Sequence, residues 1–86
     1  MQTSVVTIDS EIQSGQPVFT GTRVPIKSFF DYITTGESIE TYLEDYPYVT
    51  KEQVQALLTL LFNLFQRTTE TIFNENFNRR EFAYSA

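Results

Sequence analysis

Apolar residues recur at helical spacing in the middle of the chain, and signals for helix starts and ends frame them. Apolar positions three or four residues apart lie on one face of a helix. Such a face runs from Ile26 through Phe29 to Ile33. Pro25 before it suits the first turn of a helix, and Gly36 after it suits a helix end. The pattern predicts a first helix over residues 25–35.

Two further helices are predicted after this one. Ser38 is a good N-cap for a second helix that ends at about residue 46. Thr50 and Gln53 have the spacing of a capping box, so a third helix begins there and continues at least to Phe65. Nine of the 12 residues in the range 54–65 are apolar. A helix of this kind is buried on most of its circumference, and two short helices are too small to cover it.

The first 24 residues read as short strands and turns. A β-branched run spans residues 5–8, and a second extended piece spans 17–19 between Gly15 and Gly21. Two or three short strands are not stable alone in water. We therefore expect them to lie on the helices or to pair with a second chain.

Together these elements predict a mainly α fold with a three-helix, homeodomain-like (helix-turn-helix) core. The domain spans residues 1–65, its β-arm is residues 1–24, and an extension follows over 66–86. The extension is rich in Thr and Asn, which are poor helix formers, yet it carries several aromatic residues. It is either an arm that orders on a partner or a final helix packed on its own chain.

Charge and composition exclude most catalytic chemistry. The 86 residues carry a net charge of −5 and contain no Cys and no His. Disulfides, zinc-finger spacings, thiol nucleophiles and imidazole bases are therefore absent. Glu44 and Asp45 are adjacent on a helix and do not face each other, and no His can activate the many hydroxyl groups. We expect no enzyme activity, no metal and no cofactor.

The chain also lacks the patterns of membrane and secreted proteins. Its most apolar stretch, at 54–65, is far shorter than the ~20 residues of a membrane span. The N-terminus has no basic region followed by an apolar run. We expect a cytoplasmic protein with no membrane partner.

The second and third predicted helices have helix-turn-helix spacing. In DNA-binding proteins of this kind the N-terminal residues of the last helix face the bases. Here these residues would be Thr50, Lys51, Gln53 and Gln55. The range 37–52, however, holds five acidic residues and one Lys, and phosphates are repelled by such a surface. We expect weak DNA binding, or DNA binding that needs a partner chain.

The segment 15–23 superficially looks like a phosphate-binding loop. Its two glycines enclose five residues rather than four, no Lys follows, and Pro17 lacks the N–H that a phosphate needs. We interpret the glycines as residues of tight turns, and we expect Arg23 to be bonded to a carboxylate or to backbone carbonyl groups.

The same segment, extended to Pro25, has the pattern Gly-x-Pro-x-x-x-Gly-Thr-Arg-apolar-Pro. Three further motifs come later in the chain: Gly36-Glu-Ser-Ile39, Asp45-Tyr-Pro47 and Thr50-x-x-Gln53-Val54. Over about residues 5–62 the chain resembles the domain of unknown function 433 family. The resemblance implies a homeodomain-like three-helix core with an N-terminal β-arm, often dimeric. Some members resemble VapB-type antitoxins, encoded beside a PIN-like nuclease toxin. The resemblance also implies that the shared loop residues determine the fold: Gly15, Pro17, Gly21, Thr22, Arg23 and Pro25.

We therefore expect a small, non-enzymatic protein-binding module, antitoxin-like and acting as a dimer. A DNA-binding helix-turn-helix regulator and a stand-alone dimeric scaffold stay open as alternatives. The expected partners are a second copy of the chain and a PIN-like toxin. The expected dimer or partner contacts are the apolar residues of the third helix and the extension: Leu57, Leu58, Leu61, Phe62, Phe65, Phe73, Phe77 and Phe82.

Overall fold

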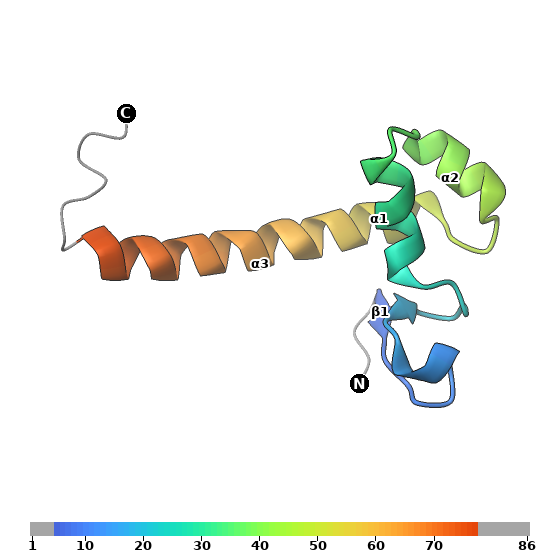
Figure 1. Ribbon diagram of the computed structural model, residues 1–86, viewed down its shortest axis with the longest axis horizontal. Coiled ribbons are helices and arrows are strands. Elements are labelled where there is room, and N and C mark those ends of the chain that lie inside the picture. The colour runs from blue at the N-terminus through green and yellow to red at the C-terminus, as the bar shows by residue number, and fades with distance from the viewer. Residues whose placement is uncertain (1–4, 78–86) are drawn as a thin grey trace.

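The computed structural model describes residues 5–77, and the side chains among them as far as residue 73. Its elements are β1 (Val6–Thr7), a short 3-10 helix η1 (Gln13–Gly15), β2 (Val18–Phe19), α1 (Ile26–Thr34), α2 (Ile39–Asp45) and α3 (Lys51–Phe77). The hairpin, α1, α2 and the first turns of α3 form a small globule, and the rest of α3 projects from it as a long arm (Figure 1). The mainly α fold class, with a short N-terminal β-arm, is confirmed.

The β-arm pairs its strands within the chain. β1 and β2 are antiparallel, with Val6 opposite Phe19 and Thr7 opposite Val18. A further bridge joins Val18 to Pro25, directly before α1. The side chains of Val18 and Phe19 are fully buried. The short strands therefore pack on the helices of their own chain, which is the first of the two predicted alternatives.

α1 begins at Ile26 and ends where the sequence predicts. Pro25 is its N-cap rather than its first residue. Gly36 follows the helix with a φ of +90°, a conformation that favours glycine. Its N–H donates to the carbonyl of Ile33 (3.1 Å), and the N–H of Glu37 donates to that of Tyr32 (2.9 Å). These two bonds form the Schellman motif that ends many helices.

Side-chain caps start the other two helices, as predicted. Ser38 Oγ accepts the Thr41 N–H at 3.0 Å at the start of α2. At the start of α3 the capping box is complete: Thr50 Oγ1 accepts the Gln53 N–H, and Gln53 Oε1 accepts the Thr50 N–H, both at 3.0 Å. Each cap satisfies backbone donors that the first turn of a helix leaves open.

The fully buried ring of Tyr42 lies at the centre of the core. Its centroid lies 5.2 Å from the rings of Phe29 and Tyr32, 4.7 Å from Tyr46 and 6.5 Å from Phe19. These rings come from β2, α1 and the end of α2. Aromatic contacts of this kind contribute about 0.5–1.5 kcal/mol beyond the area they bury, so this cluster joins the hairpin to the two short helices.

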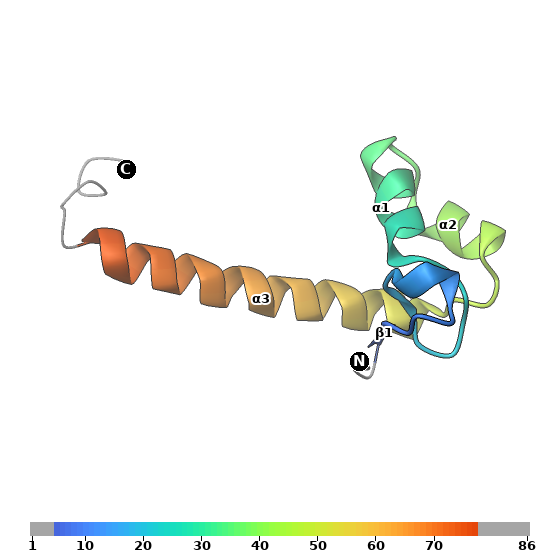
Figure 2. The same ribbon diagram turned by 60° about the horizontal axis from the view of Figure 1, so that its bottom comes forward.

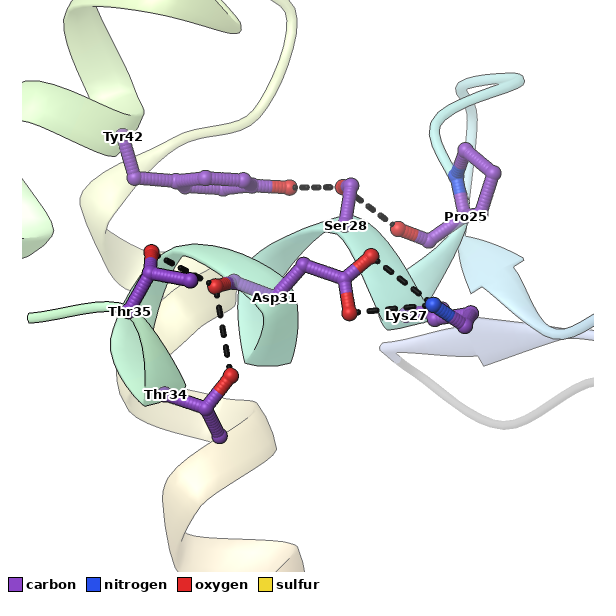
Figure 3. Close-up of polar contacts among 7 residues, drawn as sticks. All are labelled: Pro25, Lys27, Ser28, Asp31, Thr34, Thr35 and Tyr42. Carbon is purple, nitrogen blue, oxygen red and sulfur yellow. Dashed lines mark hydrogen bonds and ion pairs between the residues drawn. The ribbon is translucent and has the colours of Figure 1, made fainter. Parts of the chain in front are cut away.

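The Tyr42 hydroxyl is hydrogen-bonded inside this core. It lies 2.8 Å from Ser28 Oγ, and Ser28 Oγ donates to the carbonyl of Pro25 at 2.7 Å (Figure 3). Because a serine has one hydroxyl proton and the carbonyl is only an acceptor, Tyr42 must be the donor to Ser28. Burial raises the pKa of Tyr42. The pair ties α2 to the N-terminus of α1.

α3 extends well beyond Phe65, the residue that the sequence predicted it would at least reach. The helix continues without a break to Phe77, through the Thr-rich stretch 68–71. Unfavourable propensities of Thr and Asn are only tenths of a kcal/mol each, and adding residues to a started helix is far easier than starting one. The predicted boundary at 65/66 falls inside α3. The added turns project away from the globule in both views instead of folding back on it (Figures 1 and 2).

Within residues 5–77, no helix combines the length and the hydropathy that are needed to cross a membrane. The predicted features of residues 78–86 lie outside the described residues.

Candidate functional site

The globule covers only the start of α3. Val54 and Leu57 are 1% and 2% exposed, and Leu61 is partly buried against the core. Beyond this point the apolar side chains of α3 have little of the chain around them. Phe62 is 57% exposed and Phe65 is 65% exposed. The arm therefore carries large apolar side chains that the described chain leaves open to solvent.

These side chains follow one face of the helix. Leu58, Phe65 and Ile72 are seven residues apart, and seven residues make almost two full turns. Phe62 and Thr69 lie four residues after the first two of them, on the same face. We call the four apolar residues Leu58, Phe62, Phe65 and Ile72 the apolar stripe, and Thr69 is a polar residue on the same face. At 1.5 Å per residue the stripe is about 21 Å long.

The opposite face of α3 is polar. Thr59, Asn63, Arg67 and Glu70 succeed each other at spacings of three or four residues, and all four are exposed. Leu64, 48% exposed, widens the apolar side at its edge. α3 is therefore amphipathic along the arm, where the described globule covers neither face.

The exposed apolar surface of the arm amounts to a few hundred Å². With about 200 Å² per ring, Phe62 and Phe65 together leave on the order of 250 Å² uncovered. Leu58 and Ile72 are a further 41% and 45% exposed. Monomeric proteins rarely expose contiguous apolar patches beyond a few hundred Å², and larger patches mark interaction sites.

The structure separates the predicted contact residues into two groups. Leu58, Phe62 and Phe65 lie on the stripe, and Phe73 beside it is half exposed. Leu57, however, lies in the core of its own chain, because it faces the hairpin and the short helices. As a predicted partner contact it is therefore misplaced.

Three more of the predicted contacts need a separate account. Leu61 packs partly against the core. Phe77 is the last residue of α3, with its side chain outside the described part, and Phe82 lies outside the described residues altogether. The sequence pattern did not single out Leu64 and Ile72, which are 48% and 45% exposed on the arm. The seven-residue spacing of Leu58, Phe65 and Ile72 was a signal that could have identified Ile72.

The four residues predicted to face DNA have different surroundings. Thr50 and Gln53 form the capping box, and Gln53 Nε2 also donates to the carbonyl of Thr20 at 2.9 Å. Gln53 thereby holds the start of α3 against the hairpin. Lys51 and Gln55 are exposed. Two of the four side chains are therefore already used inside the chain.

The motif residues Gly21 and Thr22 close the loop between β2 and α1. Gly21 has a φ of +82°. Thr22 Oγ1 donates to the carbonyl of Phe19 at 2.8 Å and accepts the N–H of Val24 at 3.0 Å. The hydroxyl of Thr22 thus makes one hydrogen bond on each side of the turn, which is a structural role.

Three further motif residues, Gly15, Pro17 and Pro25, lie on either side of this loop in the sequence. Gly15 has a φ of +88°, and the carbonyl of Pro17 accepts the N–H of Ile26 at 2.9 Å. Pro25 caps α1. These positions shape the junction between the β-arm and α1.

Arg23 departs from the expectation. Its side chain is exposed, and within residues 5–77 it has neither an ion pair nor a side-chain hydrogen bond. The expected bond to a carboxylate or a carbonyl group is therefore wrong for the described part of the chain. The reason is geometric, because the turn that Thr22 closes leaves Arg23 on its outer side. With Gly21, Thr22, Val24 and the 80% exposed Tyr48, Arg23 lines an open hollow of about 360 Å³.

Charged side chains are spread over the globule. In the part of the chain that the structure describes, no group of three or more Asp or Glu residues gathers to hold a metal ion. Lys27 and Asp31 form an exposed ion pair at 2.9 Å, which contributes little to stability (Figure 3). The Tyr32 hydroxyl donates to Asp45 Oδ2 at 2.6 Å, and this bond raises the pKa of Tyr32 to about 12.

Comparison with known proteins identifies a family. The family model described as "Protein of unknown function (DUF433)" matches residues 6–59, which run from β1 to the first turns of α3. No curated protein and no solved structure matches the chain. The match ends at the beginning of the arm, so it includes Leu58 but not the rest of the apolar stripe. Since it covers more than half of the 86 residues, the chain belongs to the DUF433 family.

Proposed function

We propose that this chain is a non-enzymatic protein-binding module of antitoxin type, in which the globule is the base and the α3 arm carries the binding surface. The observation that carries the proposal is the apolar stripe, which continues along the arm beyond the part of α3 that the globule covers. An exposed amphipathic helix is a common means of docking into the apolar groove of a partner.

The chemistry of the chain supports binding rather than catalysis. It has no Cys or His, and its acidic residues are dispersed over the described surface. The partner that the family resemblance suggests is a PIN-like nuclease toxin. Binding of the arm to such a nuclease would inhibit it by occlusion and would need no reaction at the arm.

The test uses the full chain and a PIN-like nuclease encoded beside it. RNA cleavage by the nuclease is measured alone, with the unmodified chain and with two charge-matched variants. Phe65→Glu places a carboxylate in the stripe, and Asn63→Glu places one on the polar face of the same helix. We expect the unmodified chain and Asn63→Glu to inhibit, and Phe65→Glu to lose inhibition.

Two outcomes would contradict the proposal. If no nuclease-like gene lies beside this one, or if its product is not inhibited, the antitoxin role fails and a stand-alone scaffold becomes the better reading. If Asn63→Glu loses inhibition as completely as Phe65→Glu does, the stripe is not the binding surface. Far-ultraviolet circular dichroism of both variants controls for loss of the helix.

A DNA-binding regulator is the second candidate, favoured by the α2–turn–α3 arrangement with Lys51 and Gln55 exposed at the start of α3. The neighbouring surface opposes it, because the acidic residues Glu40, Glu44 and Glu52 are exposed as well. Each phosphate contact requires a cation to replace its counterions.

A titration of the lone protein on the promoter of its own operon separates the two candidates. We expect weak, non-specific binding at physiological salt. Nanomolar, sequence-specific binding that Lys51→Glu or Gln55→Ala abolishes would place the regulator first.

A further inference from the structure

We propose that Arg23 and Tyr48 form a second protein-binding site, which takes an acidic side chain that stands next to an apolar one in a partner protein. The site is the open hollow on the globule, between the β2–α1 loop and the α2–α3 turn. It goes beyond the proposed function, because the surface and the ligand differ from those of the apolar stripe. Three features support it: an unused cation, the build of the hollow and the charge of the globule.

The first feature is a cation that the described chain does not use. The basic side chains among residues 5–66 are Arg23, Lys27 and Lys51. Lys27 is paired with Asp31, whereas the exposed Arg23 has neither an ion pair nor a side-chain hydrogen bond within residues 5–77. A guanidinium carries five N–H donors in a planar fork that matches the two oxygens of a carboxylate. The donors of Arg23 are therefore available to a carboxylate from outside the described chain.

The second feature is the hollow beside this cation. Its volume is about 360 Å³, and Gly21, Thr22, Val24 and Tyr48 line it together with Arg23. Binding sites for small groups occupy about 300–1,000 Å³, so this one has room for a group the size of one or two side chains. Val24 and the ring of Tyr48 offer apolar surface next to the guanidinium. A ligand that fills the hollow therefore needs an apolar group beside its negative charge.

Hydrogen bonds hold the two walls of the hollow in place. The Thr22 hydroxyl closes the loop wall with one bond on each side of the turn. Gln53 Nε2 donates to the carbonyl of Thr20 at 2.9 Å, which holds the start of α3 against this loop. Val49 is buried in the core and fixes the backbone next to Tyr48. Walls that are fixed before binding lose little conformational freedom when a ligand arrives.

The open form of the hollow favours a protein over a small molecule. Arg23 is exposed and Tyr48 is 80% exposed, so these walls leave much of a bound group open to solvent. Sites for small molecules bury about 70–90% of the ligand surface. A protein partner supplies the missing cover from its own surface. Tyr and Arg are also the side chains that are enriched at the centres of protein interfaces.

The third feature, the charge of the globule, favours a single carboxylate over a nucleic acid. Residues 5–66 carry three basic and eight acidic residues, a net charge of −5. A nucleic acid brings many phosphates to such a surface, and each contact needs a cation to replace its counterions. Among the described residues that line the hollow, Arg23 is the single cation. One acidic side chain in an otherwise apolar segment pairs with Arg23 and adds no further negative charge.

The test uses the full, isotope-labelled chain and two synthetic peptides that differ in one group. The first peptide is acetyl-Ala-Phe-Glu-Phe-Ala-amide, and the second has Gln in place of Glu, with the same shape and apolar content. Both are titrated into the chain while nuclear magnetic resonance records the Nε–H of Arg23 and the ring of Tyr48. We expect the Glu peptide to bind roughly three- to tenfold more tightly, because a charge-assisted pair is stronger than a neutral hydrogen bond.

Three variants assign this preference to residues. Arg23→Gln should bind the two peptides equally, and Tyr48→Ala should weaken both. Lys51→Gln is the matched control, because it removes one positive charge from the same globule at an exposed position outside the lining of the hollow. It should keep the preference for the Glu peptide. Since Arg23 has no side-chain bond to lose within residues 5–77, Arg23→Gln should also keep the Tm of the unmodified chain.

Several outcomes would overturn the proposal. Equal binding of the two peptides by the unmodified chain, or binding that leaves the signals of Arg23 and Tyr48 unchanged, would exclude the acidic ligand without recourse to any variant. A loss of preference in Lys51→Gln equal to that in Arg23→Gln would leave only a long-range attraction. Tighter binding of a short oligoadenylate RNA to the same two side chains would make the hollow a nucleic-acid site instead.

The result is independent of the nuclease assay. Phe65→Glu lies on the apolar stripe and should bind the Glu peptide as the unmodified chain does. Loss of nuclease inhibition in Phe65→Glu with peptide binding intact would support both proposals. Inhibition without any binding of the Glu peptide would overturn the site at Arg23 and leave the proposed function intact.

Discussion

The side chain of Gln53 offers the sharpest test of how α3 is anchored, because its two ends make different bonds. Its Oε1 accepts the Thr50 N–H, and its Nε2 donates to the carbonyl of Thr20 at 2.9 Å. Gln53→Glu keeps an oxygen for the Thr50 N–H but replaces the donor by a second oxygen. Two acceptor atoms would then face each other across the contact between α3 and the hairpin.

The expected loss follows from these two bonds. A net hydrogen bond contributes about 0.5–1.5 kcal/mol, and a partly buried carbonyl without a donor adds to the loss. A carboxylate in the first turn of a helix returns about 0.3–1 kcal/mol through the helix dipole. We expect Gln53→Glu to lower the free energy of unfolding by about 1 kcal/mol. For a chain of this size, that lowers Tm by about 4–8 °C.

Thermal unfolding followed by circular dichroism measures the change at pH 7. Gln55→Glu is the matched control, because it introduces the same charge two residues later at an exposed position and should leave Tm within ~1 °C. Near pH 4 the new carboxyl group regains a proton that it can donate to the carbonyl of Thr20, so the difference between the two variants should narrow. If Gln53→Glu and Gln55→Glu unfold together at pH 7, the bond to Thr20 contributes nothing and Gln53 is free to contact a ligand.

Further predictions concern the core, the caps and one titration. Ser28→Ala leaves the buried Tyr42 hydroxyl without an acceptor and should lower the free energy of unfolding by about 1–3 kcal/mol. Tyr42→Phe should lower it by less, roughly 0.5–1.5 kcal/mol. The reverse order in urea unfolding would contradict the assignment of Tyr42 as the donor. The hydrogen bond of Tyr32 raises its pKa from 10.0 to about 12, so the folded state favours the neutral hydroxyl. This stabilisation is complete below pH 10 and is lost as the pH rises to 12. Tyr32→Phe should therefore remove a component near pH 12 from the ultraviolet titration of phenolate. An unchanged titration curve would argue against the raised pKa of Tyr32. Thr50→Ala should cost about 0.5–2 kcal/mol, and an unchanged denaturant midpoint would show that the capping box does not support α3. Leu57→Ala should cost about 2–5 kcal/mol as a core truncation, and a loss below ~1 kcal/mol would return Leu57 to the partner contacts.

Local signals in the sequence predicted the helix boundaries well. The capping box of Thr50 and Gln53, the N-cap Ser38 and the terminator Gly36 all act as expected. Each signal depends on residues that are three to five positions apart. Their geometry is complete once the local turn forms, and the rest of the fold has little influence on it.

Longer-range features were harder to predict. The end of α3 was left open, because the sequence predicted a helix at least to Phe65 and the weak propensities of the Thr-rich stretch did not show how far it continues. Propensity is a weak prior, and a started helix continues unless a residue such as proline stops it. The sequence also did not show that Arg23 has no ion pair or side-chain hydrogen bond among residues 5–77, since a spacing pattern does not show on which side of a turn a side chain lies.

The sequence by itself determined that α3 is a strongly apolar helix with a polar face, because that pattern depends only on spacing along the chain. It did not determine which apolar residues are covered. Leu57 and Leu58 are adjacent and chemically identical, yet the first is 2% exposed and the second 41%. Only the tertiary structure decided between them, because burial depends on where the hairpin and the two short helices lie around the axis of α3 and on how far along it they reach. The globule ends after the first turns, so the apolar face of α3 that continues beyond it stays exposed.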